Sequence, residues 1–307
     1  MVVDGWALSP SLRCPLRFFV VCWASRTLPH PSPHMGNLLA EKRREPPLSE
    51  LTLIAIEAAL NAGNVLRYGF GTHFQIKSKE GHHNLVTEYD TKAEKEIIDF
   101  IEKQVPHSAF LAEESGISGK KGPLVWIIDP LDGTVNFAHQ IPVFSVSIGV
   151  EQEGQMSAGV IFQPITQELF VAERGKGAFF NGQKMEVSRV KTLQGSILAT
   201  GFPYNLAENP HHCIEHFVHI LRAGIPIRRL GSAAIDFAYT ASGRFEGFFE
   251  VALSPWDCAA GQLILEEAGG KCSQWNGDAF DIRSRKTVLA TNGFVHEEAV
   301  ALLSRRI

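Results

Sequence analysis

The chain has 307 residues, of which 45% are apolar and 20% are charged, a balance typical of an ordinary globular protein. This composition excludes collagen-like and coiled-coil structures, as well as a chain that is disordered throughout. The 33 acidic residues outnumber the 29 basic ones and give a formal net charge of −4, so nucleic acid is disfavoured as the main partner.

The cysteines and the apolar runs bear on the protein's location. The five cysteines are Cys14, Cys22, Cys213, Cys258 and Cys272. An odd, widely spaced set without C-x-x-C pairs favours neither a disulfide framework nor a thiolate metal site, so we expect a cytoplasmic protein. The apolar run Phe18–Ala24 is far shorter than the roughly 20 residues that span a bilayer, so we expect no transmembrane helix and no membrane partner.

Residues 1–47 differ from the rest of the chain, because they hold seven of the 16 prolines. We expect this leader to form no packed element. The preferred interpretation is that Met35 is the natural start, or that the leader is a disordered extension. A weak secretory signal is the alternative, because Arg13 and Arg17 precede the apolar run, although no convincing cleavage site follows it.

Residues 48–190 are predicted to form an α+β half. Two helices are expected, over 50–68 and over 91–105, and the spacing of Thr91 and Glu94 suggests a capping box in the second. A buried strand over 124–128 is expected to stop at a turn at Asp129-Pro130. Strands with intervening turn signals follow over 143–187 and predict an antiparallel meander.

Residues 191–307 are predicted to form an α/β half, because strand and helix patterns alternate there. The expected strands are 196–200, 226–230, 247–251 and 288–291. The expected helices are 206–222, 232–242, 256–268 and 296–305. The fold class is therefore α+β followed by α/β, in two layered halves.

Three acidic clusters lie at the ends of predicted elements: Glu113-Glu114, Asp129 with Asp132, and Asp257. Each has an ordinary explanation alone, since D-P-L-D-G also suits a turn and Asp257 could cap a helix. Gathered together, such carboxylates would repel one another unless cations neutralised them. Oxygen-only ligands favour Mg²⁺, Mn²⁺ or Ca²⁺, and two such ions about 4 Å apart can support phosphate ester hydrolysis.

Two longer motifs carry a family resemblance. Trp126–Phe137 (WIIDPLDGTVNF) and Trp256–Gly270 (WDCAAGQLILEEAGG) closely resemble the signature motifs of the inositol monophosphatase family. Shorter matches at 85–94, 111–115, 175–182 and 230–237 extend the resemblance over roughly residues 50–305. The resemblance implies a layered αβαβα sandwich of the inositol monophosphatase and fructose bisphosphatase type.

The resemblance implies two or three Mg²⁺ ions per site. The ligands of the first would be Glu113, Asp129 and the carbonyl oxygen of Leu131. The ligands of the second would be Asp129, Asp132 and Asp257. Asp90 matches an acid that helps to hold a third, weaker ion and to support catalysis, although its position equally suits the start of the second helix.

The resemblance also implies roles in catalysis and substrate binding. Thr134 matches the hydroxyl that orients the attacking water together with Glu113. The phosphate would lie on the backbone amides of Gly133 and Thr134, beside Asp132. Glu250 matches a glutamate that binds inositol hydroxyls, and Ala233 matches a small residue beside the ring.

These roles imply a magnesium-dependent, lithium-sensitive phosphatase that acts on myo-inositol monophosphate and forms a homodimer. A fructose bisphosphatase, a nucleotide bisphosphatase or a histidinol phosphatase would share the metal motifs, so a small phosphorylated polyol or sugar is the expected partner. A non-catalytic regulator that binds protein or RNA is the rival from another class.

A histidine-rich segment offers a competing metal site. His212, His216 and His219 have the spacing of one helical face and could bind zinc. The preferred interpretation is a polar helix face at a subunit contact, because no assigned catalytic step uses a histidine.

Overall fold

The computed structural model describes residues 47–78, 85–120, 122–284 and 286–304. Leu48–Ile307 forms one compact unit. The predictions for the leader concern residues that, apart from Pro47, lie outside the described ones. A division at residue 190 stays a prediction, although the eight-stranded sheet ends before it and the five-stranded sheet begins after it.

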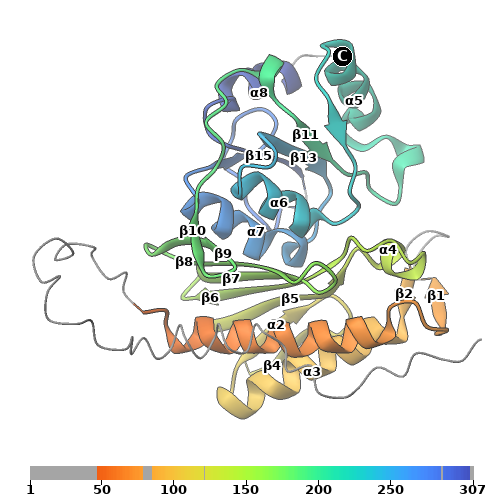
Figure 1. Ribbon diagram of the computed structural model, residues 1–307, viewed down its shortest axis with the longest axis vertical. Helices are drawn as coiled ribbons and strands as arrows, with labels where there is room; N and C mark the ends of the chain where they lie inside the picture. The colour runs from red at the N-terminus through yellow and green to blue at the C-terminus, as the bar shows by residue number, and fades with distance from the viewer. Residues whose placement is uncertain (1–46, 79–84, 121, 285, 305–307) are drawn as a thin grey trace, which may run out of the picture. The chain divides into compact units, whose positions relative to one another are not determined.

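Two helices form the first layer, beneath the larger sheet in Figure 1. The helix α2 (Glu50–Gly69) begins at Ser49, whose hydroxyl accepts a hydrogen bond from the Thr52 amide, and it confirms the helix expected over 50–68. It packs against β6 and β7. A Cβ atom on Gly63 would lie 2.4 Å from Phe162, so only glycine allows α2 to approach the sheet so closely.

The helix α3 (Glu88–Gln104) begins three residues earlier than expected. Its capping box joins Thr87 to Asp90, so the prediction that Thr91 and Glu94 form that box was wrong. The misplacement has a physical reason: Thr-x-x-acid spacing occurs twice in succession, and only the first pair follows the short hairpin of β1 (Ile76–Ser78) and β2 (Leu85–Thr87).

The second layer is an eight-stranded sheet with the order β10-β9-β8-β7-β6-β5-β3-β4. Its strands are β3 (Ala109–Ala112), β4 (Gly116–Gly119), β5 (Leu124–Asp132), β6 (Ser145–Gln152), β7 (Gln155–Gln163), β8 (Glu168–Glu173), β9 (Gly177–Phe180) and β10 (Gln183–Met185). The run from β6 to β10 is antiparallel, which confirms the predicted meander, while β3 and β5 pair in parallel. The strand predicted over 124–128 does not stop at Asp129 but continues to Asp132 through a β-bulge.

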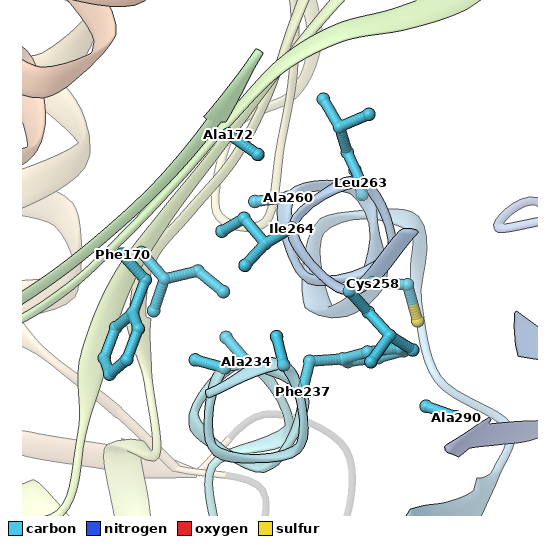
Figure 2. Close-up of a cluster of buried hydrophobic side chains, with 14 of the residues drawn as sticks. Phe170, Ala172, Ala234, Phe237, Cys258, Ala260, Leu263, Ile264 and Ala290 are labelled. Atoms are coloured by element: carbon cyan, nitrogen blue, oxygen red, sulfur yellow. The ribbon is translucent and has the colours of Figure 1, made fainter. Parts of the chain in front are cut away.

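The helices α6 (Ala233–Ala241) and α7 (Pro255–Glu267) form the middle layer and contact both sheets. Figure 2 shows side chains of both helices meeting Phe170 and Ala172 from the larger sheet and Ala290 from the smaller one. Small residues make this approach possible. A Cβ on Gly159 would lie 2.7 Å from the carbonyl oxygen of Ala260.

The fourth layer is a five-stranded sheet with the order β12-β11-β13-β15-β14. Its strands are β11 (Leu198–Thr200), β12 (Ile227–Arg228), β13 (Gly247–Val251), β14 (Lys271–Ser273) and β15 (Thr287–Thr291). The strand β11 pairs in parallel with β12 and β13, whereas β15 pairs antiparallel with β13 and β14. The sequence patterns predicted four of these strands and missed β14.

The last layer contains α5 (Cys213–Arg222) and α8 (His296–Leu303), whose apolar residues join Leu198, Phe249 and Leu289 in a second core cluster. The helix predicted over 206–222 was too long. Two short 3-10 turns, Leu206–Glu208 and Pro210–His212, precede α5, because Asn209, His211 and His212 have positive φ values that no α-helix accepts.

The order of layers is therefore helices, sheet, helices, sheet, helices, and the expected αβαβα sandwich is confirmed. No helix in the described parts of the chain is long and apolar enough to cross a membrane.

Candidate active site

The site is built around the carboxyl end of β5. Asp129 pairs with Ser147 of β6 and Asp132 pairs with Ser145, so three steps along β5 match two along its partner. Pro130 lies in this bulge, where its missing N–H leaves no gap in the ladder. The bulge thus turns the two aspartates of the D-P-L-D motif to the same region, which a regular strand would not do with residues three apart.

A tight turn after β5 places Thr134. Gly133 has φ of 99°, and a Cβ there would lie 3.0 Å from the carbonyl oxygen of Val143. Glycine is therefore required on both conformational and steric grounds. The five-residue helix α4 (Thr134–Ala138) follows, and Asn136 holds the turn in place by donating to the carbonyls of Val143 (2.6 Å) and Leu230 (2.8 Å).

Asp132 is held by the start of α6. One carboxylate oxygen accepts hydrogen bonds from the hydroxyl of Ser232 and from the backbone amide of Ala234, the latter at 2.8 Å. Burial raises the pKa of Asp132 to about 6, and these hydrogen bonds oppose the increase. Ala233, predicted beside the substrate, is buried at this same helix start.

Asp90 lies fully buried at the start of α3 and contacts the catalytic candidate Thr134. One of its oxygens accepts from the amide (2.8 Å) and the hydroxyl (2.6 Å) of Thr87, and the other lies 2.9 Å from the hydroxyl oxygen of Thr134. That hydroxyl also lies 3.0 Å from the carbonyl oxygen of Leu131, so its single proton has two acceptors. Burial raises the pKa of Asp90 to about 6. The structure therefore provides Asp90 as a hydrogen-bond partner of Thr134, and the shared role of Thr134 and Glu113 in orienting water stays a prediction.

Glu113 and Asp257 approach β5 from two other segments. The amide of Glu113 donates to the carbonyl of Ile128 (3.1 Å), which fixes the loop after β3 beside the end of β5. Asp257 is the third residue of α7, and its carboxylate accepts from the amide of Ser254 at 2.7 Å. Asp257 is thus inside the helix, and Ser254 is the N-cap.

The four carboxylates of Glu113, Asp129, Asp132 and Asp257 interact electrostatically, and we call them the acidic cluster. Burial raises the pKa of Asp129 well above its usual range, and the charges of the other three members raise it further. Three chain segments far apart in sequence therefore bring together the carboxylates that the sequence singled out.

Among the described residues, no three His, Cys, Asp or Glu side chains already stand in the arrangement of a metal site. Three members of the acidic cluster, Asp129, Asp132 and Asp257, direct an oxygen to a backbone amide. The chemistry of the donors nevertheless fits a hard divalent cation, since all are oxygens and their mutual repulsion disfavours the ionised state without a counter-charge. A bound ion would have to draw these side chains together.

Glu250 lies on β13, buried, beside this cluster. Burial, together with the charges of Asp257 and Asp132, raises its pKa to about 8, so the carboxyl holds a proton near neutral pH. A Cβ on Gly201 would lie 2.2 Å from one of its oxygens, so the carboxyl rests directly against the backbone after β11.

Several residues near the site were not predicted from the sequence. Ser232 could have been found as the N-cap before an apolar helix. Buried Asp236, whose Oδ1 has no hydrogen-bond partner among the described residues, and exposed Tyr204 carry no local signal, because only the tertiary structure brings them beside the cluster.

The competing histidine site is not formed. His212 precedes α5 with φ of 54°, so the three histidines do not share one helical face. His216 is buried against Trp275, with ring centroids 5.0 Å apart, and the described residues contain no group of three potential metal ligands there. Cys213, Cys258 and Cys272 are free thiols.

Comparison with known proteins agrees with this geometry. The chain matches the inositol monophosphatase family over residues 47–307. It is 42% identical to Nus factor SuhB of Escherichia coli over 226 residues, which cover 73% of this chain and 85% of that protein. It is also 42% identical to an inositol-1-monophosphatase of Synechocystis over 246 residues, covering 80% of this chain and 85% of the relative.

The fold agrees as well. The crystal structure of the extragenic suppressor protein suhB from Bartonella henselae superposes with a TM-score of 0.79 at 39% identity, covering 84% of this chain and all of that one. The match of the family over nearly all the described residues shows that this chain belongs to the inositol monophosphatase family, whose members are metal-dependent phosphomonoesterases.

Proposed function

We propose that this protein hydrolyses inositol monophosphate to inositol and phosphate, with Mg²⁺ as its cofactor. The observation that carries the proposal is the acidic cluster, of which Asp129 and Asp132 are buried, beside the hydrogen-bonded pair of Thr134 and Asp90. A structural role alone does not account for it, because the cluster lowers stability unless a cation neutralises it.

In this proposal Mg²⁺ is held by Glu113, Asp129, the Leu131 carbonyl, Asp132 and Asp257, with Asp90 supporting a third ion. When bound, the metal supplies charge neutralisation for the phosphoryl group and activation of water. The amides of Gly133 and Thr134 would hold the phosphate oxygens. We propose that the Thr134 hydroxyl orients the attacking water, takes a proton from it as the water attacks phosphorus, and gives its own proton to Oδ1 of Asp90, which lies 2.9 Å away. Glu113 assists in orienting that water.

Glu250 and Ala233 would contact the inositol ring. The buried carboxyl of Glu250 can form hydrogen bonds with substrate hydroxyls. We further propose a cytoplasmic, lithium-sensitive homodimer, which the free thiols and the family support.

Phosphate release by the full-length protein tests the activity. Inositol 1-phosphate, fructose 1,6-bisphosphate and adenosine 3′,5′-bisphosphate would be compared with Mg²⁺, with chelator and with added Li⁺. We expect Mg²⁺-dependent, lithium-inhibited hydrolysis with a preference for inositol 1-phosphate. A preference for either bisphosphate would retain the mechanism and replace the substrate, while no turnover of any of the three would reject the enzymatic proposal.

A Nus-factor role is the second candidate, because the Escherichia coli relative is named Nus factor SuhB. In this proposal the chain acts by binding partners and needs no phosphate release. The test is complementation of cells that lack that relative, with the native chain and with Asp129→Asn. Equal rescue by both supports the binding role, and rescue by neither rejects it.

A further inference from the structure

We propose that the turn after β11 (Gly201–Asn205) contacts the alcohol portion of the phosphate ester. Gly201 leaves room for the Glu250 carboxyl, and Tyr204 offers its ring and hydroxyl to the substrate. This inference rests on the proposed phosphatase function. It assigns specificity to residues that take no part in binding the metal or the phosphate.

The register of the smaller sheet places this turn beside Glu250. The strands β11 and β13 run in parallel with Thr200 opposite Phe249, and the Thr200 hydroxyl donates to the Phe249 carbonyl at 2.7 Å. Gly201 is therefore level with Glu250, whose carboxylate oxygens would lie 2.2 and 2.3 Å from a Cβ at that position. Any side chain at Gly201 would displace the carboxyl.

The turn is held in a defined conformation. Phe202 packs edge-on against Phe217 of α5, with ring centroids 5.2 Å apart. The Pro203 carbonyl accepts from the Leu206 amide at 3.1 Å, and the Asn205 carbonyl accepts from the Glu208 amide at 2.8 Å. These contacts anchor the turn on both sides of Tyr204.

Tyr204 itself has no internal role that explains its position. It is 61% exposed, and within the described residues its hydroxyl has no hydrogen-bond partner. Burial, followed by the charges of all four members of the acidic cluster, raises the pKa of Tyr204 to about 12. Tyr204 therefore borders the acidic cluster while its ring remains accessible to a ligand.

An aromatic ring with a free hydroxyl suits a polyol. The ring can cover the apolar C–H face of a cyclic alcohol, and the hydroxyl can pair with a substrate hydroxyl. Glu250, whose carboxyl lies against Gly201 of the same turn, can pair with further substrate hydroxyls. A substrate whose alcohol lacks both features would gain little from either residue.

The test compares kcat/KM for inositol 1-phosphate with kcat/KM for ethyl phosphate, whose alcohol offers neither a ring nor free hydroxyls. The inhibition constant of inorganic phosphate serves as a measure of the metal and phosphate site alone. We expect Tyr204→Ala to lower kcat/KM for inositol 1-phosphate about tenfold, mainly through KM, and Tyr204→Phe to lower it a few-fold. Ethyl phosphate turnover and phosphate inhibition should change less than about twofold.

Gly201→Ala is the second variant, because its methyl group would displace the Glu250 carboxyl from its present position. Its φ is not positive, so alanine meets only the Glu250 side chain and no backbone strain. It should reproduce the loss of selectivity without greater damage to ethyl phosphate turnover.

Phe294→Ala is the matched control. Phe294 is also an exposed aromatic residue three or four positions beyond a strand of the same sheet. It follows β15, which runs antiparallel to β13, so it lies at the edge opposite Gly201. It should leave both kcat/KM values unchanged.

The outcomes distinguish a failure of the proposed substrate contact from a failure of the proposed phosphatase function. Equal losses for both substrates, or no loss in Tyr204→Ala, would overturn the inference while leaving the phosphatase intact. A native protein that hydrolyses no phosphate ester with Mg²⁺ would instead reject the proposed function on which the inference depends.

Discussion

The helices α6 and α7 differ sharply between their first turns and their bodies. At the first turns, Ser232 and the Ala234 amide hold Asp132, and Asp257 is a member of the acidic cluster. Along the bodies most buried residues are apolar and many are alanine, and a Cβ on Gly261 would lie 2.5 Å from Phe237 of the other helix. The first turns carry unfavourable charge, whereas the bodies carry favourable packing.

The two regions depend on each other. Close packing of the bodies brings the first turns of both helices to the end of β5, where the carboxylates repel one another. The apolar packing of the bodies of α6 and α7 must therefore stabilise an arrangement of carboxylates that is unfavourable until a cation binds. This contrast predicts that substitutions in the two regions change the stability of the metal-free protein in opposite directions.

The largest effect is expected for Asp129→Asn. It should lower kcat/KM by at least about a thousandfold, because a metal ligand is lost. It should also raise the melting temperature of the metal-free protein, since a buried, repelled charge is removed. Asp99→Asn, in an exposed pair with Lys95, is the control. A loss of activity accompanied by a lower metal-free melting temperature would contradict the repulsion argument.

Thr134→Val and Asp90→Asn should each lower kcat about a hundredfold, because both disrupt the same proton path. The double variant should be no worse than the poorer single one, since residues that act as a unit are not additive. Steady-state kinetics of the three variants provides the measurement. Additive losses would mean that Asp90 and Thr134 act separately.

In the packed region, Gly159→Ala should destabilise the protein by about 1–3 kcal/mol, because its Cβ would meet the backbone of α7 at 2.7 Å. Gly122→Ala is the matched control, since its nearest neighbour would be 3.9 Å away, and it should change stability by less than about 0.5 kcal/mol. Urea unfolding measures both. Equal unfolding midpoints for the two variants would show that the packing of α7 on the larger sheet accommodates the added methyl group without loss of stability.

Glu250→Gln should raise KM for inositol 1-phosphate about tenfold and leave KM for ethyl phosphate nearly unchanged. The amide keeps the size of the carboxyl but changes the hydrogen bonds that it offers. Steady-state kinetics with the two substrates measures both KM values. Equal increases for both would remove Glu250 from the leaving-group site.

The smallest effect concerns pH. Burial raises the pKa of Glu250 to about 8, so its contribution to stability is complete below its unfolded pKa and is lost as pH rises through 8. Buried His296, with its pKa lowered to about 4, opposes this trend only below its unfolded value of 6.5. We therefore expect the unfolding free energy of the metal-free protein to fall between about pH 7 and pH 8.5.

Urea unfolding in chelator across that range measures this decline. Glu250→Gln should reduce it, and Mg²⁺ should offset it, because a cation favours the ionised carboxylates. Stability that rises with pH over the same range would contradict the assigned pKa direction.

Local sequence predicted the regular elements whose signals lie within a few residues. The helix α2 and the meander from β6 to β10 match their patterns because apolar periodicity and turn residues act locally. The start of α5 was misplaced, since left-handed conformations at Asn209 and His211 leave no trace in hydrophobic periodicity. The strands β1, β2, β3, β4 and β14 were not predicted, because runs of three or four residues carry little pattern, although the equally short β11 was found.

The amino-acid sequence alone determined the family and indicated the chemistry at the end of β5, because the long motifs at Trp126–Phe137 and Trp256–Gly270 are contiguous and do not depend on tertiary contacts to be read. Only the tertiary structure decided which groups meet. The bulge in β5 turns Asp129 and Asp132 together, the start of α3 supplies Asp90 to Thr134, and the register of β11 on β13 sets Gly201 against Glu250. The last two contacts join residues 44 and 49 positions apart, and their geometry depends on how the layers pack, which no local pattern encodes.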